Sequence, residues 1–119
     1  MTVTVAEGYA ELRMWREAWE VLDELPPTRR ASCQALRVRL KCCPMVGAWK
    51  IGEQVAMLLR DGARRDRGSA AAFYHLNARR LLAAGDREGS KVNILAAVDT
   101  FPECRTVLLA DRELAAEFF

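Results

Sequence analysis

The stretch MWREAWEVL at residues 14–22 is matched in pattern, 34 residues later, by AWKIGEQVA at residues 48–56. Each copy has a tryptophan in its second place and a small residue in its fifth: Trp15 and Ala18, then Trp49 and Gly52. Apolar residues in both copies recur at spacings of three and four, which places them on one face of an α-helix. A helix that returns at a fixed period predicts a chain built from repeated helical units.

A third and weaker copy, GDREGSKVNIL, opens at Gly85. Gly47 corresponds to Gly85, and Gly52 corresponds to Ser90, at a spacing of 38. The four extra residues fit in the stretch DGARRDRGS at residues 61–69, which is the one clear loop signal in the chain. Three copies are about the number that a helical-repeat protein needs to bury its apolar faces.

Helix-forming residues dominate the whole chain, and no run predicts a strand. Thr4, Thr28 and Ser69 are the candidate N-caps between punctuating prolines and glycines. The expected helices cover about residues 5–12, 16–25, 28–43, 48–60, 69–84, 87–100 and 103–117. Short turns between them predict an antiparallel helical array.

This pattern resembles the tetratricopeptide repeat (TPR) family, whose unit is a helix–turn–helix of about 34 residues. The third copy is the most similar, with family-like residues at Tyr74, Ala78, Gly85, Ser90, Ala97 and Pro102. The resemblance implies an all-α solenoid formed by residues 1–119 as a single domain. Its repeats would be at about 1–32, 33–66 and 71–104, with a capping helix at about 103–118. A non-repeating helical bundle is the alternative interpretation.

Composition predicts a folded domain without a cofactor. The 119 residues are 51% hydrophobic and 29% charged, which is enough for a core without a metal or disulfide. No segment is apolar over the length that a membrane span needs, and the amino terminus has no signal-peptide pattern. Four cysteines without a C-x-x-C, and a single histidine, predict free thiols rather than a metal site. We therefore expect a cytoplasmic protein that has no membrane contact.

The net charge of +2 hides an uneven distribution. Residues 28–91 carry fourteen basic and five acidic side chains, whereas both ends of the chain are acidic. The arginines at and beside the expected loop, residues 60, 64, 65 and 67, have no interleaved aromatic residues and fit a solvated loop. A basic helical array that binds nucleic acid is nevertheless one hypothesis that the charge leaves open.

The first helices of successive repeats line a concave surface in proteins of this kind. The register implied by the resemblance places a peptide-binding groove at Gln34, Arg37, Lys41 and Met45, and at His75, Arg79 and Leu82. Val3, Glu7, Ala10 and Ala72 face the same groove in this register. The basic members would suit an acidic peptide or an acidic helix face. A solvated, charged helix face is the alternative interpretation of the same residues.

Catalytic motifs are missing from the sequence. It has no glycine-rich phosphate loop, no nucleophile motif and no paired acids in a recognisable frame. We expect a protein–protein interaction module or scaffold that binds a peptide or helix of a partner, not an enzyme with a small-molecule substrate. A chaperone-like holder of a small secreted or assembling subunit is the alternative within the same fold.

Overall fold

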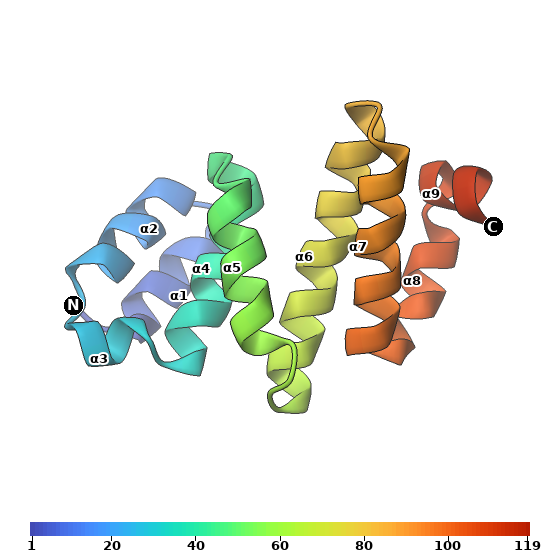
Figure 1. The fold of residues 1–119 in the computed structure, drawn as a ribbon. Coiled ribbons are helices and arrows are strands. Elements are labelled where there is room, and N and C mark those ends of the chain that lie inside the picture. Colours follow the sequence, from blue (N-terminus) through green and yellow to red (C-terminus); the bar gives the residue numbers. More distant parts are fainter.

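The computed structural model describes residues 1–119, and every regular element in it is a helix (Figure 1). The absence of strands confirms the all-α class that the sequence predicts. The elements are α1 (Val3–Glu11), α2 (Trp15–Glu24), α3 (Pro27–Arg30), α4 (Cys33–Val46), α5 (Trp49–Leu59), α6 (Arg64–Ala83), α7 (Arg87–Thr100), the 3-10 helix η1 (Pro102–Cys104), α8 (Arg105–Ala110) and α9 (Arg112–Phe118).

Short polar side chains cap the N-termini of four of these helices. Each accepts a hydrogen bond from the backbone N–H three residues on, a donor that the first turn of a helix leaves free. The pairs are Thr2 with Val5 (3.3 Å), Ser32 with Ala35 (3.2 Å), Asp86 with Gly89 (2.8 Å) and Asp111 with Leu114 (3.3 Å). The first cap is thus Thr2 and not Thr4, which lies within α1. Gly47 and Gly85 follow α4 and α6 with φ of 77° and 85°, a conformation that glycine adopts without strain.

Helix α6 begins earlier than the sequence predicts. The expectation of a loop at residues 61–69 with Ser69 as a cap is wrong, because α6 begins at Arg64 and includes Ser69. Asp66 explains the difference. Its carboxylate lies in the first turn of α6, where the helix dipole favours an anion, and accepts a hydrogen bond from Arg37 of α4. These interactions stabilise helix in a stretch whose composition alone favours a loop.

Two other expected helices are divided. The helix predicted for residues 28–43 is split into α3 and α4, because Ser32 caps a new helix. Helix α4 then continues past Pro44, which lies in its last turn. The helix predicted for residues 103–117 is split into η1, α8 and α9, because Asp111 leaves helical geometry and caps α9.

Helices that follow one another in the chain pack together along the molecule. Helix α1 packs on α2, α4 on α5 and α6 on α7, while α4 contacts both α1 and α6. The molecule measures 44 × 27 × 21 Å, and its two termini lie at opposite ends (Figure 1). The order α1, α4, α6 therefore forms a row of neighbouring helices, and this row positions the candidate site.

Two apolar clusters form the core. The first joins α1, α2 and α4 around Leu22, which is fully buried. The second extends from α4 to α9 and includes Phe73, Leu108 and Leu114. Trp19 packs against both clusters. Helix α5 lies close to α6 because Gly52 has no side chain, and a Cβ atom there would overlap the ring of Phe73.

A buried polar network connects α5, α6 and α7. The side chain of Asn77 in α6 is fully buried, and its Nδ2 donates to Glu53 of α5 (3.1 Å) and to Asn93 of α7 (3.0 Å). Its Oδ1 accepts from Nη2 of Arg80 at 2.7 Å. The guanidinium of Arg80 also lies over the ring of Trp49, 4.8 Å from the centroid. Every polar atom of this buried amide therefore has a partner, as buried polar groups require.

Candidate functional site

A groove lies against the row formed by α1, α4 and α6. It has a volume of about 490 Å³, and its lining residues come from these three helices. The apolar part of the lining consists of Ala10, Val38, Leu40, Pro44, Ala72, Phe73 and Leu76. Leu76 is 43% exposed, so part of this apolar surface faces solvent. An exposed apolar surface rimmed by polar residues is typical of a binding site.

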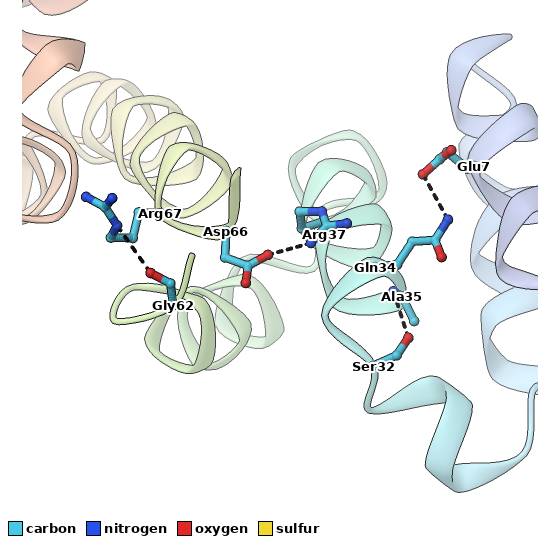
Figure 2. A network of polar contacts seen from close by, with 8 residues as sticks. All are labelled: Glu7, Ser32, Gln34, Ala35, Arg37, Gly62, Asp66 and Arg67. Carbon is cyan, nitrogen blue, oxygen red and sulfur yellow. Dashed lines mark hydrogen bonds and ion pairs between the residues drawn. The ribbon is translucent and has the colours of Figure 1, made fainter. Parts of the chain in front are cut away.

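Two side-chain contacts hold the three helices around the groove (Figure 2). Gln34 of α4 donates from Nε2 to Oε2 of Glu7 in α1, at 3.4 Å. Arg37 of α4 donates from Nη1 to Oδ1 of Asp66 in α6, at 2.5 Å. Asp66 is only 5% exposed, and its ion pair is therefore screened little by solvent. Helix α4 is thus joined by side chains to the helix on each side of it.

The groove brings together some of the predicted site residues. Arg37 and Lys41 line it, as do Glu7, Ala10 and Ala72. Of the other predicted residues, His75 and Arg79 lie at a second hollow, whereas Met45 and Leu82 line neither the groove nor that hollow. Gln34 reaches across to Glu7 without lining the groove.

Met45 and Leu82 lie outside the groove that Arg37 and Lys41 line. Met45 is 56% exposed in the last turn of α4 and is not part of the groove lining. Leu82 is partly buried and packs against the larger apolar cluster.

His75 and Arg79 lie at a second hollow, of about 380 Å³, between α6 and the α8–α9 segment. Nε2 of His75 is hydrogen-bonded to Oδ2 of Asp111 at 2.7 Å, and Nη1 of Arg79 lies 3.5 Å from the same oxygen. Burial favours a higher pKa for Asp111. The hydrogen bonds from His75 and from the N–H of Leu114, together with the charge of Arg79, outweigh burial and lower that pKa.

A third hollow connects the first two. It is mostly apolar, has a volume of about 400 Å³ and lies between α6 and the η1–α8 segment. Leu76 lines both this hollow and the groove, and Val107 lines both this hollow and the one at His75. One face of α6 therefore borders all three.

Sequence reasoning missed four groove residues on α6: Arg65, Ser69, Phe73 and Leu76. The expected loop at residues 61–69 includes the first two and so gives them no helical register. With Ala72 they form the series 65, 69, 72, 73 and 76, the spacing of one helix face. That series was present in the sequence and would have found them if α6 had been extended to its true start.

Most of the cations that the sequence singled out have acidic partners. Arg37 pairs with Asp66, and His75 and Arg79 share Asp111. The arginine cluster near residue 64 is also mostly paired, because Arg60 lies 3.5 Å from Asp99, Arg64 lies 2.5 Å from Glu103, and Arg67 donates to a backbone carbonyl. Arg64, Arg65 and Arg67 are helical residues rather than loop residues. Among the basic residues predicted for the groove, Lys41 is therefore the one without an acidic partner.

The cysteines are all free thiols. Burial raises the pKa of Cys42 to about 11, against the charges of Arg39 and Lys41. Burial, with the neighbouring Cys42, raises the pKa of Cys43 to about 12. At neutral pH both groups are therefore protonated, and neither supplies a thiolate nucleophile.

Comparison of the chain with protein-family models, with curated proteins and with solved structures finds no match. No three side chains of histidine, cysteine, aspartate or glutamate come together as a metal ion would need. None of the helices combines the length and the apolar character that crossing a bilayer requires.

Proposed function

We propose that this chain is a tetratricopeptide-like interaction module that binds a segment of another protein in the groove beside α1, α4 and α6. One observation carries the proposal: three helices far apart in the sequence leave an apolar, solvent-facing groove at their junction. A repeat array presents such a surface because its first helices lie side by side.

The chemistry of the groove supports binding in preference to a reaction. Its lining is mainly alanine and larger apolar residues, with charged side chains around them. A partner that removes this apolar surface from water makes the free energy of binding more favourable, by roughly 25 cal/mol per Å². The buried thiols are protonated at neutral pH, and His75 is engaged with Asp111. A docking surface requires only the apolar and charged lining described above.

The test places a charge in the groove and a matched charge outside it. The first variant is Leu76→Asp, and the control is Leu58→Asp, whose leucine is 69% exposed on α5 and away from the groove. The partner captured by the tagged wild-type protein is identified by mass spectrometry, and capture is repeated with both variants. We expect Leu76→Asp to lose the partner and Leu58→Asp to keep it, with unchanged circular dichroism.

The two variants separate the groove, together with the adjoining apolar hollow that Leu76 also lines, from the surface of α5. Equal capture by wild type and Leu76→Asp would contradict the proposal. Loss on Leu58→Asp alone would move the contact to α5. Retention of nucleic acid in place of a protein would support a basic helical array instead.

A further inference from the structure

The charges at the groove have opposite signs on its two sides. Glu7 and Glu11 come from α1, whereas Lys41 and Arg65 come from α4 and α6. None of these four side chains takes part in an ion pair within the protein. Glu7 has a single long hydrogen bond, from Gln34 at 3.4 Å. Both signs of charge are therefore free to interact with a bound molecule.

This arrangement argues against a purely acidic partner. Arg37 lines the groove, but its charge is already matched by Asp66. The free cations are Lys41 and Arg65, and they are balanced by Glu7 and Glu11 across the groove. Like charges placed together at an interface are unfavourable, so an acidic segment would be repelled on the α1 side. A partner with one charge sign on each side would be matched on both.

The walls of the groove favour a helix over an extended segment. All three walls are α-helices, whose backbone N–H and C=O groups are mostly bonded within the helix. An extended peptide would find few backbone partners there, whereas a helix satisfies its own backbone groups. Ala10, Ser69 and Ala72 are small lining residues that allow close approach of another helix.

We infer that the groove binds an amphipathic helix whose apolar stripe has basic residues along one edge and acidic residues along the other. The basic edge faces Glu7 and Glu11 of α1, and the acidic edge faces Lys41 and Arg65. Because reversing the helix would exchange its edges, this charge pattern also fixes the direction in which the helix lies. The inference rests on the proposed function and specifies the chemistry of the partner.

The test uses three designed helical peptides of about 18 residues, a length of about 27 Å. All share one leucine–alanine stripe. The first has lysine on one edge and glutamate on the other, the second has lysine on both edges, and the third has glutamate on both edges. Affinity is measured by fluorescence anisotropy with the full chain at low and at physiological salt. We expect the first peptide to bind about five- to tenfold more tightly than the others, with the difference reduced by salt.

A charge reversal provides the decisive comparison. In the double variant Glu7→Lys, Glu11→Lys both sides of the groove are basic, and we expect the peptide with glutamate on both edges to become the tightest binder. The control Glu17→Lys, Glu24→Lys makes the same charge change on α2, where neither residue lines the groove. The control should keep the wild-type order of affinities.

The outcomes distinguish this inference from the proposed function. Equal affinity of all three peptides, or tightest binding of the all-glutamate peptide to wild type, would overturn the inference. Absence of binding by all three would overturn the choice of a helix. In each case the effect of Leu76→Asp on partner capture still decides whether the groove is the binding surface.

Discussion

Asp111 connects two elements through a single carboxylate. One oxygen is hydrogen-bonded to His75 of α6, and the other accepts from the N–H of Leu114 at the start of α9. The side chain is 6% exposed, and Arg79 lies 3.5 Å away. The end of the chain is therefore attached to α6 by an interaction that depends on the ionisation of one group.

This dependence predicts how stability changes with acid. The pKa of Asp111 is lower in the folded protein than that of an unperturbed aspartate. The ionised group therefore stabilises the fold fully above the unperturbed pKa, and the contribution is lost as pH falls through the folded-state pKa. We expect Asp111→Asn to lower the free energy of unfolding by about 1–2 kcal/mol at pH 6. The difference from wild type should shrink toward pH 3.

Urea unfolding followed by circular dichroism at several pH values between 3 and 6 measures this difference. Asparagine is a suitable control in itself, because it can cap α9 as aspartate does and removes only the charge. A difference that stays constant over the whole range would show that the carboxylate charge is not the stabilising feature.

For single residues, the position on a helix face could be predicted from the sequence, but the side-chain partner could not. Arg37 and Lys41 were found from their register, and both line the groove. The acidic partners of Arg37 and His75 could not be predicted in the same way. Asp66 lies 29 residues from Arg37, and Asp111 lies 36 residues from His75. Pairing over such distances depends on how the helices pack, and helical periodicity carries no information about it.

At the scale of helices, replacing either of two glycines by alanine is expected to change the stability in opposite directions. Gly52 of α5 faces the ring of Phe73, and an added Cβ would lie 2.6 Å from its Cζ. Phe73 is 2% exposed and cannot move away freely. Gly8 of α1 has no atom within 4 Å of the same position. We expect Gly52→Ala to destabilise the protein by about 1–3 kcal/mol through overpacking.

We expect Gly8→Ala to stabilise the protein by roughly 0.5–1 kcal/mol, because alanine is the better helix former. Thermal unfolding of both variants beside wild type measures the two effects. Stabilisation by both substitutions would mean that α5 and α6 can move apart at little cost, contrary to the close contact at Gly52.

Helices were predicted well where local signals decide and poorly where tertiary contacts do. Helix α7 was expected at residues 87–100 and is found there, because Asp86 caps it and the residues form helices readily. Helix α6 was predicted to begin five residues too late, since the ion pair of Asp66 supports its first turns. The break before α9 was missed, although Asp111 was visible in the sequence as a capping residue.

At the scale of the whole molecule, the core is divided between the two ends. The cluster around Leu22 belongs to α1, α2 and α4, and the cluster around Leu114 and Leu108 belongs mainly to the helices that follow. The main helix contacts of this elongated row join neighbouring helices and not its two ends. Opening of one end is therefore expected to leave the other end folded.

The substitution Leu22→Ala tests this division. Leu22 is fully buried, so its loss should cost about 2–5 kcal/mol in the part of the molecule that it stabilises. Native-state hydrogen exchange should show reduced protection in α1, α2 and α4, with α6 and α7 little changed. Leu114→Ala is the matched control and should instead reduce protection in α6 and the helices that follow, with α1 and α2 little changed. An equal loss of protection in every helix would show that the molecule opens as one unit.

The all-α class and the order of most helices could be read from the sequence, because both follow from local preferences and from the repeated pattern around Trp15 and Trp49. Some residues of the groove along α1, α4 and α6 could be predicted from the sequence. The charge of the groove could not be predicted, because it depends on which basic side chains form ion pairs after folding.

The buried amide of Asn77 limits which parts of the chain can be exchanged with parts of other proteins. It bonds to Glu53 in the preceding helix pair and to Asn93 in its own. A transplanted α6–α7 hairpin would arrive without Glu53 and leave a buried donor short of a partner, at a cost of about 1–3 kcal/mol. The units of this chain are therefore not interchangeable modules, and recombination at this junction would have to carry α5, α6 and α7 together.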